Sequence, residues 1–179
     1  MREGFGRGGQ QANKSRSIVF ADGTAAVVID QRHLPSLMFV SWHGQATEKV
    51  VRGYFGWMNQ FHRDLGDRQR YVMVVDLMDN QPVSASARKM IAQVYAENFG
   101  EEDQRFSLGM ILVVQNPLLR GAMTAVGWLI KHDLKLHFAG SNKEAIADAL
   151  TLFQQGGVSS PIGLSPDTFE RPGFHPSKA

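Results

Sequence analysis

One stretch decides the fold class: residues 71–88 have the sequence YVMVVDLMDNQPVSASAR. Its first seven residues are apolar except for Asp76, and such a run is typical of a strand that is covered on both faces. A polar corner with Pro82 follows, and Ser84 and Ser86 stand just before a helical pattern. A buried strand that leads directly into a helix indicates an α/β protein with parallel strands.

The rest of the body repeats this alternation of apolar runs and helical periods. Asn116 with Pro117, and Ser141 with Glu144, are typical helix starts, because their side chains and the missing proline donor suit the free amides of a first turn. Apolar residues at intervals of three and four predict helices over about 47–65, 84–99, 116–130 and 141–155. Apolar runs predict strands over 71–77, 108–114 and 134–140.

Three strands are predicted ahead of the first helix. SIVF and AAVVID flank Asp22-Gly23, a dipeptide that favours the tight turn of a β-hairpin. LMFVSW, residues 37–42, is the third strand, and the three together predict an antiparallel edge. The expected fold is therefore α/β: a mixed sheet with parallel central strands and an antiparallel N-terminal edge, with helices packed on it.

The 179 residues divide into a body and two extensions. Residues 1–17 are predicted to be a disordered, basic, glycine-rich tail, residues 18–155 one α/β domain, and residues 156–179 a proline- and glycine-rich C-terminal tail. The last segment either lies in a groove on this molecule or on a neighbouring one, or is a mobile tail. The apolar residues concerned are Ile162, Leu164, Phe169 and Phe174.

The net charge of +2 is unevenly distributed along the chain. Residues 1–17 contain four basic residues and one acidic residue, which leaves 15 basic and 16 acidic residues for the remainder. A near-neutral body is not expected to bind nucleic acid, so only the RGG-like N-terminal tail is a candidate for such contact. The chain has no cysteine, no signal-peptide pattern and no run of about 18 apolar residues, and we expect a cytoplasmic protein without a membrane span.

The sequence contains no recognisable catalytic set. Its six histidines are never spaced as a metal-binding pair on a helix, and it has neither a nucleophile elbow nor a phosphate-binding loop. Asp76 and Asp79 stand at a strand end and would need Asp133 or Glu97 to hold a cation. We therefore expect no enzyme activity, no bound metal and no cofactor.

A further candidate is an anion site at the carboxyl ends of the parallel strands, where helix N-termini converge. Asn116 and Ser141 begin two of these helices, and Arg120 would add a positive charge. The alternative is that Asn116 and Ser141 only cap their helices, as such residues do in many α/β proteins.

Three stretches of the body carry a family resemblance: VVDL at 74–77 with its polar corner, GMILVVQNPLLRGAMTAVGWL, and FAGSNKEAIADAL. Together with the order of elements, over roughly residues 25–155, they resemble the STAS or SpoIIAA-like family of anti-sigma-factor antagonists and sulphate-transporter tails. The resemblance implies a bacterial, non-catalytic protein that docks to partner proteins through the corner before the second helix. In phospho-regulated members a serine of a D-S-S-G-like sequence is phosphorylated there; Ser84 and Ser86 stand at about that place, but VSASAR lacks the aspartate and the glycine.

Three functions are expected from these patterns. The leading hypothesis is a regulatory or scaffolding module that binds another protein, with a partner-binding or phospho-switch corner at Asp76, Asp79, Ser84 and Ser86. The second is binding of a small hydrophobic ligand or lipid between helices and sheet, suggested by Trp57, Met58, Met90, Met110, Met123 and Trp128. The third is nucleic-acid association through the N-terminal tail. Exposed sheet edges are also compatible with a homo-oligomer.

Overall fold

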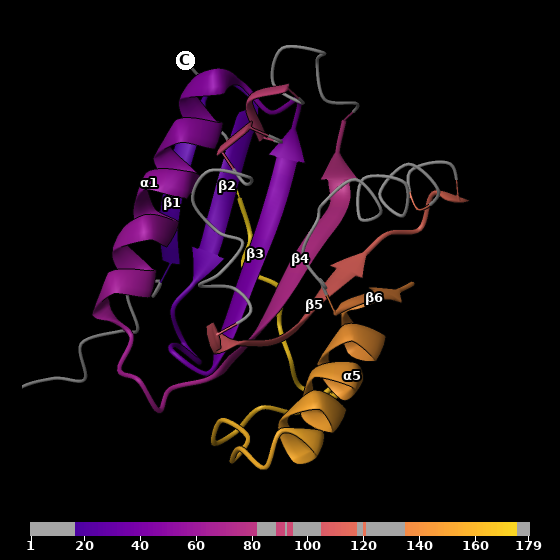
Figure 1. Ribbon diagram of the computed structural model, residues 1–179. Coiled ribbons are helices and arrows are strands. Elements are labelled where there is room, and N and C mark those ends of the chain that lie inside the picture. The colour runs from indigo at the N-terminus through magenta and orange to yellow at the C-terminus, as the bar shows by residue number, and fades with distance from the viewer. Residues whose placement is uncertain are drawn as a thin grey trace, which may run out of the picture.

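The computed structural model describes residues 17–81, 89–91, 93–94, 105–117, 120 and 135–174 of the chain. Within these residues, six strands form one mixed sheet whose spatial order follows the sequence (Figure 1). The strands are β1 (Ser17–Asp22), β2 (Ala25–Asp30), β3 (Leu37–Gly44), β4 (Tyr71–Asn80), β5 (Ser107–Val113) and β6 (Leu136–Ala139). The pairs β1–β2 and β2–β3 are antiparallel, and β3 to β6 are parallel. The predicted α/β class, with its antiparallel N-terminal edge, is confirmed.

The turn between β1 and β2 lies one residue later than the sequence suggested. Asp22 pairs with Ala25 as the last residue of β1, so Gly23 and Thr24 form the two-residue loop. Gly23 takes the left-handed φ of 61° that this loop requires, which glycine adopts without a Cβ clash. The expectation that Asp22 belongs to the turn was wrong, because Asp22 extends the ladder and accepts a hydrogen bond from the Thr47 hydroxyl at 2.9 Å.

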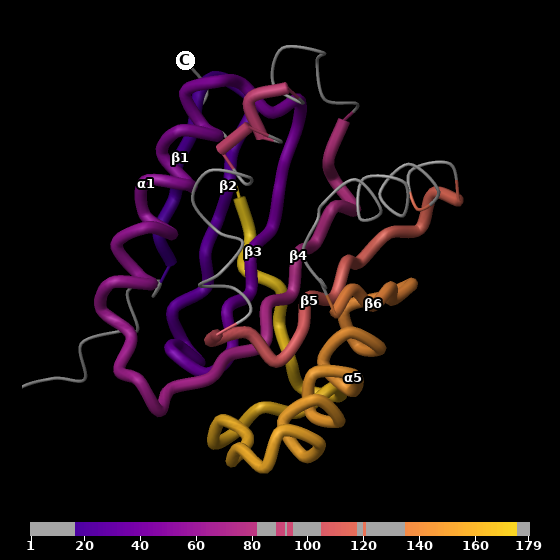
Figure 2. Tube along the Cα trace, in the orientation of Figure 1, coloured from indigo at the N-terminus to yellow at the C-terminus, as the bar shows by residue number. Residues whose placement is uncertain are grey.

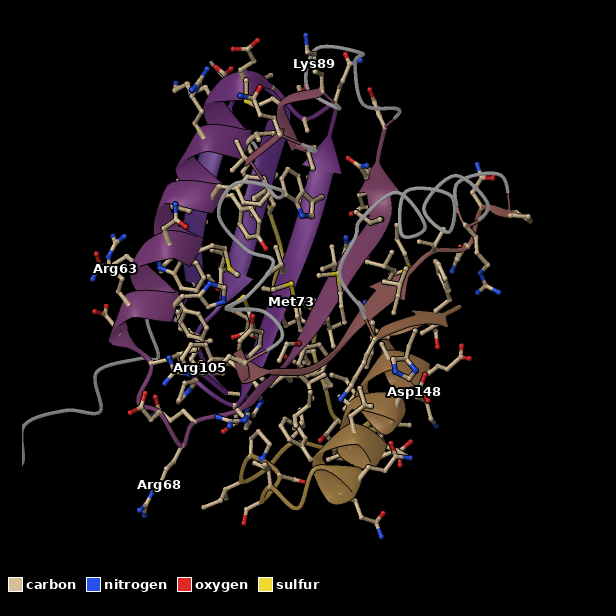
Figure 3. The ribbon with its side chains drawn as sticks, viewed as in Figure 1. Arg63, Arg68, Met73, Lys89, Arg105 and Asp148 are labelled. Carbon is tan, nitrogen blue, oxygen red and sulfur yellow. The ribbon has the colours of Figure 1, made fainter. Side chains whose placement is uncertain are left out.

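Helix α1 (Glu48–Asp64) covers one face of the sheet over β1 to β3. It begins where predicted, since the Thr47 side chain accepts a hydrogen bond from Val50 N, and it ends just before Gly66. Its apolar stripe packs on the buried side of the strands, where Met73 lies inward while Arg63 projects from the helix (Figure 3). The buried residues of α1 are Val50, Val51, Tyr54, Phe55, Met58 and His62. We call this side of the sheet the helix-covered face.

Described residues of the second predicted helix pack on the same face. Met90, Ile91 and Val94 contact the core beneath α1. This is expected, because crossovers between parallel strands are right-handed. When each new strand is added on the same side of the previous one, right-handed crossovers place their helices on the same face of the sheet. The helix predicted over 116–130 lies mostly outside the described residues, of which Pro117 and Arg120 are helical. Among the described segments, those that follow β6 pack on the opposite face of the sheet.

Helix α5 (Asn142–Gln155) covers part of this opposite face, next to β4, β5 and β6. The predicted cap at its start is confirmed, because Ser141 Oγ accepts from Glu144 N at 3.1 Å, but the Glu144 carboxylate accepts from Gly140 N and not from Ser141 N. The helix ends at Gly156, and Gly157 follows with a left-handed φ of 63°. Neither α1 nor α5 is long and apolar enough to cross a membrane, and the same holds for every helical stretch among the described residues.

Residues 158–174, which we call the C-terminal strap, cover more of the same face. Figures 1 and 2 show the strap in yellow, running behind the sheet from α5 along β3. Leu164 is buried and Phe169 packs against the core beneath α5, whereas Ile162 is fully exposed. Within the described residues the strap pairs with no strand. We call this side of the sheet the strap-covered face.

Candidate functional site

The strap-covered face carries four buried polar side chains from β2, β3 and β4. Asp30, Ser41, His43 and Asp76 are all buried, whereas the remaining buried polar residue among those described, His62, lies on α1. Directly paired residues of neighbouring strands share a face, and Ser41 pairs with Asp76. A row of polar groups in an otherwise apolar surface requires partners, because an unpaired buried polar group is destabilising.

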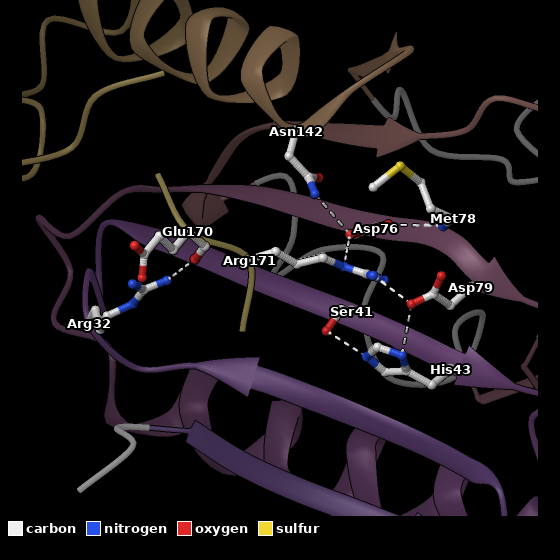
Figure 4. Close-up of polar contacts among 9 residues, drawn as sticks. All are labelled: Arg32, Ser41, His43, Asp76, Met78, Asp79, Asn142, Glu170 and Arg171. Atoms are coloured by element: carbon white, nitrogen blue, oxygen red, sulfur yellow. Dashed lines mark hydrogen bonds and ion pairs between the residues drawn. The ribbon is translucent and has the colours of Figure 1, made fainter. Parts of the chain in front are cut away.

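A β-bulge brings two carboxylates to the same face. Ser41 pairs with Asp76 and His43 pairs with Asp79, so two steps along β3 correspond to three along β4. In a regular strand, residues three apart point to opposite faces. The extra residue in β4 re-aims Asp79 toward the side of Asp76, as bulges commonly do next to binding sites. Figure 4 shows both carboxylates directed at one guanidinium.

The guanidinium belongs to Arg171 of the strap and bridges the two carboxylates. Arg171 Nε lies 2.5 Å from Asp76 Oδ2, and Nη1 lies 2.5 Å from Asp79 Oδ2. The Nε contact is an ion pair without hydrogen-bond alignment, and within the described residues Nη2 has no acceptor. The hydrogen bond from Arg171 lowers the pKa of Asp79. The two carboxylates of β4 thus share one cation, which comes from a residue 92 positions after Asp79.

Asp76 is the more deeply placed of the two carboxylates, with 0% exposure. Its Oδ1 accepts a hydrogen bond from Met78 N at 2.9 Å, and its Oδ2 accepts one from Asn142 Nδ2 at 3.1 Å. These two donors orient the carboxylate but do not neutralise it. A charge in such a setting depends on its counter-ion, because removing one partner of a buried ion pair destabilises a protein by about 3–5 kcal/mol.

His43 contacts both the carboxylate cluster and the strap. Its Nδ1 lies 3.2 Å from Asp79 Oδ2 and its Nε2 lies 3.2 Å from Ser41 Oγ, while its ring centroid is 5.4 Å from that of Phe174 in the strap. Burial and then the charge of Arg171 lower the pKa of His43, more than Asp79 raises it. The ring is therefore neutral near pH 7, with the Nδ1 proton assigned from its carboxylate partner.

A second anchor holds the strap closer to its start. Arg32 forms a two-pronged contact with Asp30, with Nε 2.9 Å and Nη2 2.6 Å from Asp30 Oδ2, and Nη2 also donates to the carbonyl oxygen of Glu170. The Arg32 guanidinium lies over the Phe169 ring, 5.3 Å from its centroid. Phe169 in turn packs on Phe39 with the ring centroids 4.8 Å apart. This second anchor therefore consists of the Phe39–Phe169 ring contact and the Arg32 guanidinium.

This arrangement is suited to hold a guanidinium between two carboxylates, with an aromatic contact on each side. Among the described residues, no three His, Asp or Glu side chains are grouped as metal ligands would be. Glu97 and Asp133, the residues suggested as further cation ligands for Asp76 and Asp79, lie outside the described residues.

The predicted corner is only partly covered by the structure. Asp76 and Asp79 lie together, but Ser84 and Ser86 lie outside the described residues, so a phospho-switch at these serines stays a prediction. The strand also continues beyond the predicted end, because β4 runs to Asn80, which pairs with Gly44 of β3.

The three residues of the suggested anion site lie at neighbouring strand ends, where Gln115 Nε2 donates to Gly140 O at 3.4 Å. Ser141 caps α5, and the Glu144 carboxylate accepts from Gly140 N at 2.6 Å, so an internal anion already occupies this helix start. Asn116 O accepts from Arg120 N at 3.0 Å, and the Arg120 guanidinium lies 5.6 Å from the centroid of the Phe138 ring. Anion binding here remains a prediction.

The methionines and tryptophans that suggested an apolar pocket are split between the core and undescribed parts of the chain. Met58 is buried in the core of the helix-covered face, and Trp57, Met90 and Met110 pack against it. Trp57 also stacks on Phe61. Met123 and Trp128 lie outside the described residues.

Sequence reasoning missed the residues that complete the cluster, namely Arg171, His43 and Asn142. The available signal was weak: an arginine between two phenylalanines, FERPGF at 169–174, in a segment without helical or strand periodicity. No protein-family model, curated protein or solved structure matches the chain, so the comparisons establish no family for it.

Proposed function

We propose that the protein is a non-catalytic regulatory or scaffolding module that acts by binding another protein. The observation that supports this best is the strap-covered face, which holds residues 169–174 of the strap mainly by their side chains. Phe169, Arg171 and Phe174 each meet a matching group, and the strap is not part of the sheet. A surface that holds a polypeptide segment through these side-chain contacts is suited to bind a segment of another protein.

The resemblance to STAS and SpoIIAA-like proteins supports the same proposal. Members of that family act by docking, and the mixed sheet with a buried strand leading into the polar corner fits their architecture. The corner after β4 continues from the same strand that carries Asp76 and Asp79. A partner at the corner and a partner on the strap-covered face would thus contact adjoining surfaces.

The test is in-cell photo-crosslinking of the full chain in its source organism. A photoreactive amino acid replaces either Ile162, which is fully exposed on the strap, or Arg63, which is exposed on α1. We expect one protein to be recovered in stoichiometric amount, with crosslinks from position 162 that exceed those from position 63. Recovery of no stoichiometric protein from either position, with the variants folded and expressed, would contradict the proposed function.

A further inference from the structure

The contacts made by the strap show which chemical groups the surface beneath it can bind. Two ring contacts, Phe39 with Phe169 and His43 with Phe174, flank the pair of carboxylates that holds Arg171. The three strap residues are two and three positions apart in the sequence. Their side chains and the Glu170 carbonyl oxygen make the contacts, without strand pairing among the described residues.

Without the strap, the carboxylates of Asp76 and Asp79 would lose the cation that bridges them, because the other arginine of this surface, Arg32, pairs with Asp30. Asp76 would keep its hydrogen bonds from Met78 N and Asn142 Nδ2, neither of which carries charge. Asp79 would keep its contact with His43 Nδ1 at 3.2 Å, which does not bridge the two carboxylates as Arg171 does. Any segment that replaces the strap must therefore bring its own positive charge.

That charge is best supplied by arginine. In the strap, Nε and Nη1 of Arg171 each reach a different carboxylate, and only a planar fork of donors makes both contacts in one fixed geometry. A lysine offers a single, strongly hydrated ammonium group and would gain less from this site. The rings on either side then select for aromatic residues near the arginine.

From this geometry we propose that the strap-covered face binds a segment of a partner protein that presents an arginine between two aromatic residues, and that the strap occupies this site in competition. This inference rests on the proposed function and names the partner chemistry for it. The strap competes at a high effective concentration because it is tethered directly to α5. Exchange of straps between two copies would replace each contact by an identical one, and these contacts would not offset the entropy lost on association, so a different protein is the expected occupant.

The experiment uses a fluorescent synthetic peptide of residues 164–174, LSPDTFERPGF, and the full-length protein. In the Arg171→Gln protein the strap loses its cation while the receiving surface is unchanged. We expect this variant to bind the peptide at least tenfold more tightly than the wild-type protein does, measured by fluorescence anisotropy. A peptide with Arg171→Gln should bind at least tenfold more weakly, and one with Arg171→Lys should be intermediate.

Several results would overturn this inference. They are absence of peptide binding to the folded variant, equal binding of the arginine and glutamine peptides, or a strap-exchanged dimer of the wild-type protein by size-exclusion chromatography and crosslinking. If Arg171→Gln does not fold, the same measurement is made on Phe169→Ala, which weakens the other anchor of the strap. Peptide binding without a cellular partner would contradict the proposed function alone, whereas a partner crosslinked only through α1 would contradict this inference alone.

Discussion

The two faces of the sheet are covered in different ways. On the helix-covered face, the 17-residue helix α1 satisfies its own backbone and contributes an apolar stripe to the core. On the strap-covered face, residues 158–174 contribute separate side-chain anchors, among them Phe169 and Arg171. Regions with few cooperative contacts open at lower free energy than the core. We infer that the strap can open while the sheet and α1 remain folded.

The largest effect is expected on the helix-covered face. Met58 is 2% exposed beneath α1, so Met58→Ala leaves a cavity that the surrounding core cannot fill. We expect the free energy of unfolding to fall by about 2–5 kcal/mol, as for other buried methionines. Urea denaturation followed by circular dichroism measures this, and a loss below about 1 kcal/mol would contradict the assignment of this face as the cooperative core.

A smaller effect is expected for the charged anchor of the strap. Arg171→Met leaves the Asp76 carboxylate without its cation, and we expect a loss of roughly 3 kcal/mol at most, because opening of the strap lets Asp76 become hydrated. Adding Asp76→Asn should restore part of this loss. The matched control is Lys143→Gln, which breaks the exposed Lys143–Asp167 pair and should leave stability unchanged. Additive effects of Arg171→Met and Asp76→Asn would contradict the pairing.

The aromatic anchor should contribute less. Phe169 is only partly buried, although it packs on Phe39 and beneath the Arg32 guanidinium. We expect Phe169→Ala to reduce the free energy of unfolding by about 1–2 kcal/mol, and Ile162→Ala, at a fully exposed position of the strap, to have no effect. Equal effects of the two substitutions in the same urea titration would show that the strap is not docked through Phe169.

The smallest effect is expected from pH. The pKa of His43 in the folded protein is lowered by burial and Arg171, so the unfolded chain binds more protons as the pH falls below roughly 6.5. Stability should therefore be full above that pH and decrease on acidification, while the lowered pKa of Asp79 keeps the Arg171 pair charged until more acidic pH. Ser41, Asp76, Asp79, Arg171 and Phe174 surround the ring.

Thermal melts at pH 7.5 and 5.5 measure this dependence. His43→Gln should show a smaller difference between the two pH values than the wild-type protein. A remaining dependence is expected from His33, whose pKa is also lowered by burial. An unchanged pH dependence in His43→Gln would contradict the role assigned to this histidine.

Much of the fold was predictable from the sequence because its signals are local. The apolar stripe of α1, the cap at Thr47 and the cap at Ser141 each depend on residues within a few positions of one another. The turn at Gly23 was misplaced by one residue, since ladder pairing of Asp22 with Ala25 outweighed the local preference of the Asp-Gly dipeptide.

The candidate site was less predictable because its contacts are not local. Asp76 and Asp79 were recognised as candidates, but residues three apart in a regular strand lie on opposite faces. A β-bulge brings them to the same face, and the sequence has no residue pattern that predicts this bulge. Their shared cation lies 92 residues after Asp79, in a segment without periodicity. The polar residues of the strap-covered face can be recognised as neighbours only when the strand register is known, because this register pairs Ser41 with Asp76.

The most direct test of the difference between the two faces is the rate at which chymotrypsin cleaves after Phe169 in the folded protein. Cleavage requires the strap to leave the sheet, and its rate follows the population of the open form. The account predicts slow cleavage of the wild-type protein and at least tenfold faster cleavage of Arg171→Gln, with α1 and the sheet intact in both by mass spectrometry. Equal cleavage rates, or loss of the whole sheet together with the strap, would contradict it.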